Sequence, residues 1–236
     1  MRWIKKLIVN KYEIVLFPKD FYVSDISSLL EESKKIDIFS DGANSIIPLP
    51  PNAPREIPRI LLRSKDSSIQ CNIGFDKVNI VWVNSKESEG FKKSLADILN
   101  LTVELSEVLF PHIPTHTVKR IGYIQEFFAA YEKPLDIISE TVLGGEVKTD
   151  LKEFTCQLLY GLQLETYSEC NQVFTLATGK KQTGEKENVL MLTNDINTLQ
   201  TKDVNWKIEE IKKFITEVNR KSDKKDLGAR FLKQNE

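Results

Sequence analysis

The sequence contains 236 residues, of which 33 are basic and 34 acidic, and its formal net charge is −1. This length allows one large domain or two small ones with a real buried core, and an apolar content of 41% is typical of a folded chain and excludes intrinsic disorder. The near balance of charge excludes a global electrostatic attraction to nucleic acid or to anionic lipid.

The first residues of the chain are apolar, but Lys11 and Glu13 interrupt them before the core of a signal peptide is complete. No other stretch approaches the roughly 18 to 20 apolar residues that span a bilayer. We therefore expect a cytoplasmic protein without a membrane partner.

The first half predicts a strand over residues 4–17, a short helix from Ser24 to Lys35 and a long surface loop over residues 37–58. The loop contains Gly42 and five prolines, which exclude regular helix and central strand. Apolar residues at steps of three and four then predict an amphipathic helix, and they are Phe91, Leu95, Ile98, Thr102, Leu105 and Leu109.

Between the loop and this helix, residues 54–83 predict two strands joined by a turn at Asp76 and Lys77. With that turn, Phe75 would face Val78, Ile73 would face Ile80 and Cys71 would face Trp82, which gives the hairpin one apolar face. Asp-Lys lacks the glycine that a tight type I′ turn favours, so a connection longer by one or two residues is the alternative.

The second half repeats this order of elements. Residues 118–131 predict a strand, Asp136 opens a short helix, residues 151–165 and 170–178 form a strand pair, and NVLMLTN is a third strand. A final helix has apolar residues at the same spacing as the first long helix, and they are Val204, Ile208, Ile211, Ile215 and Val218.

We therefore predict an α+β fold with an antiparallel sheet built from two pseudo-repeats, each a strand, a helix, three strands and a long helix, with the helices packed on one face. Residues 1–114 form the first α+β half, and residues 115–236 form the second half with a basic C-terminal tail. Two such units would join edge to edge into one wide sheet. The alternative is two different α+β halves that share an element order by chance.

Cofactor and metal sites are not indicated. His112 and His116 have a spacing that would suit a metal on a helix, but Pro111 and Pro114 exclude that helix. The glycines match neither a phosphate loop nor a dinucleotide fingerprint. The three cysteines have no disulfide or zinc spacing, and we interpret them as small buried apolar residues.

The strongest enzymatic alternative is a metal-dependent nuclease that uses Asp136, Glu146 and Lys148. In such an enzyme two carboxylates hold a divalent cation and a lysine polarises the attacking water. The Glu-Val-Lys triplet follows Gly144 and Gly145, however, which is more typical of a turn than of a buried strand.

Aromatic side chains provide a candidate partner-binding surface. Tyr123, Phe127 and Tyr131 fall on one face of the strand over residues 118–131, where they either pack beneath the helices or form an apolar docking surface. The basic tail after Arg220 is either a solvated terminus or an arm for a phosphate-rich partner, with Phe231 as an apolar anchor.

Two segments carry a family resemblance, namely Arg59, Leu61, Ser64 and Asp66 at the strand entry and Arg120-Ile121-Gly122-Tyr123 in the later strand. They resemble a sporadically distributed, uncharacterised family of prokaryotic proteins of similar length, over about half of the chain. The N-terminus departs from that family's usual opening. The resemblance implies an accessory protein from a mobile or defence-related gene neighbourhood and a fold like that of the SecB chaperone, and it transfers no catalytic residue.

The sequence thus predicts a non-enzymatic interaction module that holds a protein or peptide partner, because an antiparallel sheet supplies area and edges whereas convergent catalytic groups are not evident. Besides the nuclease, a saddle-like nucleic-acid-binding protein remains an alternative, which would need lysines and arginines clustered on the open sheet face. A homo-oligomer is compatible with either binding function.

Overall fold

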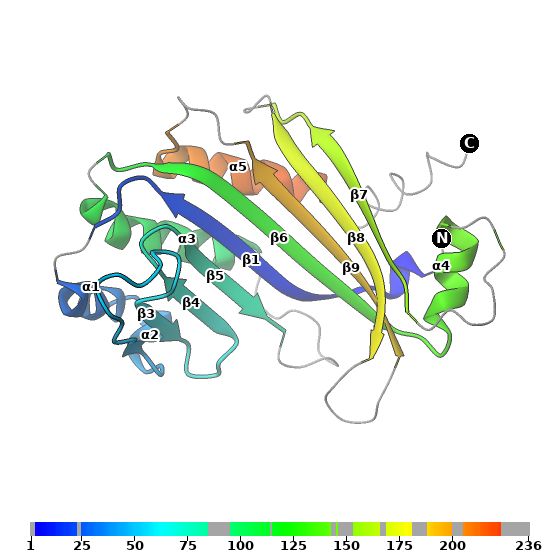
Figure 1. The fold of residues 1–236 in the computed structure, drawn as a ribbon, viewed down its shortest axis with the longest axis horizontal. Helices are drawn as coiled ribbons and strands as arrows, with labels where there is room; N and C mark the ends of the chain where they lie inside the picture. Colours follow the sequence, from blue (N-terminus) through cyan, green and yellow to red (C-terminus); the bar gives the residue numbers. More distant parts are fainter. Residues whose placement is uncertain are drawn as a thin grey trace.

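The fold is a single nine-stranded sheet in which every strand pair is antiparallel, with five α-helices among the described residues (Figure 1). It is seen in a computed structural model that describes residues 3–22, 25–84, 95–113, 115–142, 145, 153–165, 169–180, 188–199 and 205–222. The predicted α+β class with an antiparallel sheet is confirmed.

The first half of the chain contributes five strands and three α-helices. In chain order they are the 3-10 helix η1 (Ile4–Lys6), β1 (Ile8–Pro18), α1 (Ile26–Ser33), α2 (Asp37–Ser40), β2 (Ser45–Ile46), β3 (Ile60–Arg63), β4 (Ile69–Ile73), β5 (Val78–Val83), α3 (Leu95–Leu109) and the 3-10 helix η2 (Phe110–His112).

The second half contributes four strands and two α-helices, namely β6 (Val118–Ala130), α4 (Pro134–Val142), β7 (Thr155–Leu162), β8 (Cys170–Lys180), β9 (Asn188–Thr198) and α5 (Ile208–Lys221). None of the helices in the described segments is long and apolar enough to cross a bilayer.

The strand order across the sheet is β2-β3-β4-β5-β1-β6-β9-β8-β7. The two halves meet where β1 pairs with β6, in a register that places Ile14 opposite Tyr123 and Leu16 opposite Ile121. Strands from both halves are therefore hydrogen-bonded into one continuous sheet (Figure 1).

One face of the sheet carries the core. Tyr123 and Phe127 alternate with outward-facing residues of β6 and so point to the same face. Tyr123 belongs to a large apolar cluster with residues of α1, α2, α3 and α5, and Phe127 belongs to a smaller cluster with Ile138 of α4 and Ile4 of η1. The helices thus cover two regions of the same sheet face.

The two long helices form within the stretches that the apolar spacing predicts, and Phe91 and Val204, the first residues of the two patterns, lie outside the described residues. Ile98, Thr102, Leu105 and Leu109 of α3 are all buried, and Thr102 satisfies its hydroxyl by donating to the carbonyl of Ile98 at 2.8 Å. The inward face of α5 is likewise buried and includes Ile211, Phe214, Ile215 and Val218. The periodicity therefore defined the buried face of both helices.

The β4–β5 hairpin has the longer connection that was the alternative, and the register that assumed a turn at Asp76 and Lys77 is wrong by two residues. Ile73 pairs with Val78, Cys71 with Ile80 and Ile69 with Trp82, so the connection spans residues 74–77. The apolar face is as predicted, because a shift of two residues preserves side-chain alternation.

The cause of the longer connection lies in the proline-rich loop. The backbone N–H of Phe75 donates to the carbonyl of Arg55 at 2.8 Å, and Arg55 Nε donates to Asp76 Oδ1 at 2.9 Å. The Arg55 guanidinium also lies 5.5 Å from the centre of the Phe75 ring. Phe75 is thereby held by the loop, which prevents it from pairing with Val78.

Residues 37–58 contain more regular structure than the predicted surface loop, since they include α2 and the two-residue strand β2. Asp25 caps α1 by accepting from the backbone N–H groups of Ser27 and Ser28, whereas Ser24, the predicted cap, lies outside the described residues. The short β2 covers the edge of β3, and at the opposite edge the described residues place no strand beyond β7.

Candidate partner-binding groove

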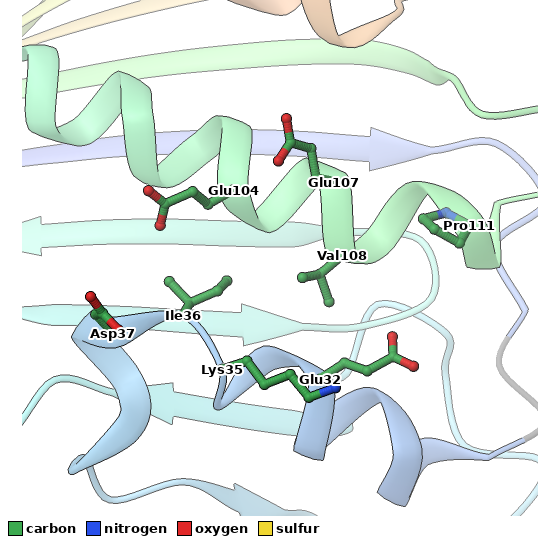
Figure 2. A pocket seen from close by; sticks show the side chains of 8 residues that line it. All are labelled: Glu32, Lys35, Ile36, Asp37, Glu104, Glu107, Val108 and Pro111. Atoms are coloured by element: carbon green, nitrogen blue, oxygen red, sulfur yellow. The ribbon is translucent and has the colours of Figure 1, made fainter.

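A groove runs between α3 on one side and α1 with α2 on the other (Figure 2). It consists of two adjoining cavities of about 560 Å³ and about 350 Å³ that share Asp37 and Glu104. We call it the α1–α3 groove. Its lining residues are Glu32, Lys35, Ile36, Asp37, Ile38, Ile69, Trp82, Asp97, Asn100, Leu101, Glu104, Glu107, Val108 and Pro111.

One wall of the groove is a single face of α3 and of η2, which follows α3 directly. Asp97, Leu101, Glu104, Val108 and Pro111 follow one another at steps of three and four, so they stand above one another along the helix. The fourteen steps from Asp97 to Pro111, at a helical rise of about 1.5 Å each, give this wall a length of about 21 Å.

The opposite wall is the end of α1 and its junction with α2. The chain turns sharply there, because the backbone N–H of Ile36 donates to the carbonyl of Ser33 at 3.2 Å and that of Phe39 donates to the carbonyl of Ile36 at 2.9 Å. The turn directs Ile36 towards Val108 in the space between the two helices (Figure 2).

The floor of the groove is apolar and its rim is acidic. Val108 and Ile38 are half-buried against the large core cluster, whereas Asp37, Glu104 and Glu107 are exposed. Among the described residues, these three carboxylates have no ion-pair partner within 4.0 Å. Five carboxylates and one lysine line the groove, and His112 lies at its end with Nε2 3.4 Å from Glu32 Oε2.

The face of the sheet opposite the helices has a different chemistry. On β1, Lys11 forms an ion pair with Glu13 at 3.2 Å, and Asn79 Nδ2 donates to Glu13 Oε1 at 3.0 Å. Partial burial raises the pKa of Asp195, and this effect outweighs the hydrogen bond from Asn197 and the attraction of Arg120, both of which lower the pKa. Basic and acidic side chains are therefore intermixed on the central strands.

Two of the aromatic residues predicted to form a partner-binding surface, Tyr123 and Phe127, lie in the core. Tyr123 is 0% exposed and Phe127 is 1% exposed, and the hydroxyl of Tyr123 donates to Asn219 Oδ1 of α5 at 3.4 Å. Tyr131 is half-buried and donates to the carbonyl of Trp3 at 3.3 Å, and Phe231 lies outside the described residues. Tyr123 and Phe127 therefore pack beneath the helices, which was the first of the two interpretations, and their rings are inaccessible to a partner.

The structure describes only one of the nuclease candidates. Asp136 is exposed in the first turn of α4, whereas Glu146 and Lys148 lie outside the described residues. Within the described segments there is no group of three or more His, Cys, Asp or Glu side chains placed to hold a metal ion. His116 is turned towards the backbone, where Nδ1 lies 2.8 Å from the carbonyl of Phe110.

Two of the three cysteines match the prediction of small buried residues. Cys71 is 0% and Cys170 is 2% exposed, and burial raises the thiol pKa of both, to about 11 for Cys170. Cys156 is half-buried on the edge strand β7, where the prediction of full burial is wrong because an edge strand is covered on one side only.

The groove itself was missed by the sequence reasoning. Asp97 and Glu104 flank the apolar stripe of α3 and Glu107 lies opposite it, so the sequence alone does not distinguish these three residues from an ordinary solvated helix face. Only the tertiary fold places Asp37 and Lys35, some 60 residues earlier in the chain, across from them (Figure 2). The positions of Glu104 and Glu107 on α3 could therefore be predicted from the sequence, but the segment that faces them across the groove could not.

Comparisons with known proteins assign no family. No family model matches the chain, and no curated protein matches it. The chain is similar to the solved structure of a rolling circle replication initiator protein from Geobacillus stearothermophilus, with a TM-score of 0.29 and 7% identity over 89% of this chain and 78% of that one. At this level the likeness assigns neither a fold nor an activity to the chain.

Proposed function

We propose that this protein is a non-enzymatic interaction module that binds a protein or peptide partner in the α1–α3 groove. The observation that carries the proposal is the combination of a half-buried apolar floor at Val108 and Ile38 with exposed carboxylates at Asp37 and Glu104. An apolar centre surrounded by a polar rim is the usual composition of a protein-binding surface.

The exposure of the groove carboxylates supports binding over catalysis. Catalytic acids, bases and nucleophiles work in sites from which water is excluded. Asp37, Glu104 and Glu107 are exposed on the rim of the groove.

Charge also favours a protein partner over nucleic acid. A phosphate backbone requires a cluster of lysines and arginines, but Lys11 and Arg120 share the face of the central strands opposite the helices with Glu13, Glu126 and Asp195. The α1–α3 groove is acidic and would repel phosphate. Among the described residues, neither surface carries the cluster of lysines and arginines that a saddle-like nucleic-acid binder needs.

We further propose that residues 1–114 and 115–236 arose by internal duplication. The support is that both halves run strand, helix, three strands and long helix once α2 and β2, which are additional elements of the first half, are set aside. From the centre of the sheet outward, the strands then follow the order β1-β5-β4-β3 in the first half and β6-β9-β8-β7 in the second. The SecB-like fold, the cytoplasmic location and the role in a prokaryotic accessory or defence-type system remain proposals that rest on the sequence and its family resemblance.

The groove is tested with Val108→Trp, which fills the floor between α1 and α3 with a large ring. Peptides are first selected from a random-sequence display library for binding to the unmodified protein. We expect their affinity for the Val108→Trp variant to be at least about tenfold lower, since the indole occupies the space of the bound side chains. Fluorescence anisotropy measures the affinities. Ile137→Trp is the matched control, because Ile137 is also a half-buried aliphatic residue but lies on α4 over the second core cluster.

If Val108→Trp does not fold, Lys35→Trp blocks the same groove from an exposed position on the other wall. Selected peptides that bind all variants equally would show that the groove is not the binding site, and the proposed function would then fail.

A further inference from the structure

We infer that the partner of the α1–α3 groove is a cationic amphipathic helix of another protein, an inference that rests on the proposed function and specifies its ligand. Charge, main-chain hydrogen bonding and the length of the groove each support this partner.

Charge selects a basic occupant. The rim carboxylates of Asp37, Glu104 and Glu107 are exposed and have no ion-pair partner within 4.0 Å among the described residues, and Lys35 is the one basic residue against five acidic ones in the lining. Like charges held on both walls repel one another, and lysine or arginine side chains placed between the walls would relieve that repulsion. An acidic occupant would increase it.

Backbone hydrogen bonding selects a helix. An extended peptide gains its main-chain partners from an exposed strand edge. One wall of this groove is α3, whose interior N–H and C=O groups are already paired, and at the other wall the N–H groups of Lys35 and Ile36 donate to the carbonyls of Glu32 and Ser33. The edges of the sheet lie elsewhere, at β2 and β7. A helix satisfies its own main chain and needs only side-chain contacts, so it can bind between two helices.

Length and spacing agree with a short helix. The α3 wall extends for about 21 Å, which is the length of a helix of about 14 residues. The half-buried floor residues Ile38 and Val108 would contact its apolar stripe, while its flanking lysines would reach Asp37 and Glu104, the two carboxylates shared by both cavities.

The test uses a fluorescein-labelled peptide of about 14 residues made of leucine and lysine, with leucines at helical spacing. Two comparison peptides have glutamate in place of lysine or the same composition with strictly alternating leucines. We expect the lysine helix peptide to bind at least about tenfold more tightly than either comparison peptide, and its affinity to fall as salt rises from about 50 mM to about 300 mM.

The matched variants separate a local effect from net charge. Asp37→Asn combined with Glu104→Gln removes the two shared carboxylates and should weaken binding of the lysine peptide about threefold to tenfold. The control double variant, Asp136→Asn with Glu140→Gln, removes one Asp in the first turn of α4 and one exposed Glu of the same helix. It changes the net charge by the same amount as the first double variant, and we expect it to change the affinity for the lysine peptide by no more than about twofold.

Equal binding of the lysine and glutamate peptides, or equal weakening by the two double variants, would overturn the inference. If library-selected peptides still respond to Val108→Trp in that case, the proposed function stands with a ligand of another chemistry. If they do not respond, the function itself fails.

Discussion

Three buried polar side chains form a chain of hydrogen bonds between β8, β9 and the end of α5. Gln172 Nε2 donates to Asn194 Oδ1 at 2.8 Å, and Asn194 Nδ2 donates to Ser222 Oγ at 2.9 Å. On β9, Asn194 lies between Leu192 of the smaller cluster and Ile196 of the larger one. This chain therefore separates the two apolar clusters and fixes the end of α5 over the sheet.

Asn194→Ala should lower the free energy of unfolding by about 2 to 4 kcal/mol, because Gln172 and Ser222 each lose a partner in a site without solvent and a small cavity remains. Urea denaturation followed by circular dichroism measures the change. Thr193→Ala is the control, since Thr193 is the neighbouring residue on the other face of β9 and is only half-buried. If Asn194→Ala lowered the free energy of unfolding no more than Thr193→Ala does, these hydrogen bonds would make no net contribution to stability.

For individual helices and strands, features that depend on residues close together in the chain were predicted from the sequence, whereas features that depend on distant residues were not. The buried face of α3 was readable from Ile98, Thr102 and Leu105, because a local repeat determines which side of a helix turns inward. The hairpin register was not readable, because it depends on the hydrogen bond between Phe75 and Arg55, 20 residues away in the chain. The α1–α3 groove depends on pairing two helices more distant still.

The short helix α2 depends on one close approach of backbone to backbone. A Cβ atom at Gly42 would lie 1.6 Å from the carbonyl oxygen of Arg63, and Asn44 Oδ1 beside it accepts from the backbone N–H of Arg63 at 3.0 Å. Glycine at this position thus lets the chain after α2 lie directly against β3.

Gly42→Ala should lower the free energy of unfolding by about 2 kcal/mol or more, because the backbone of β3 must shift to admit the methyl group. Gly161→Ala is a matched control, since a Cβ there has nothing within 4 Å, and we expect it to be neutral or to stabilise by up to about 1 kcal/mol. Thermal unfolding by calorimetry compares the two. Similar effects of both substitutions would contradict the proposed close contact.

At the scale of the whole molecule, the central pairing of β1 with β6 makes the two halves one structural unit. The large core cluster contains Leu29 and Ile80 from the first half together with Phe214 and Val218 from the second. Neither half buries its apolar face by itself in this arrangement.

We therefore expect a single cooperative unfolding transition. Trp82 and Trp206 lie in the large cluster and Trp3 in the smaller one, so fluorescence reports on both clusters while far-ultraviolet circular dichroism reports on the sheet. The two signals should change at the same denaturant concentration. Separate midpoints would show instead that residues 1–114 and 115–236 unfold as independent domains.

The position of β1 also has a consequence for protein synthesis. About 100 residues separate Pro18 from Val118, and at about 5 to 20 residues per second the ribosome needs about 5 to 20 seconds to supply the second neighbour of β1. During that interval one side of an eleven-residue strand has unpaired main-chain groups that nascent chains on adjacent ribosomes can bind. The yield of native protein should therefore depend on how quickly translation passes through Ala130, and slow codons between the halves should increase aggregation.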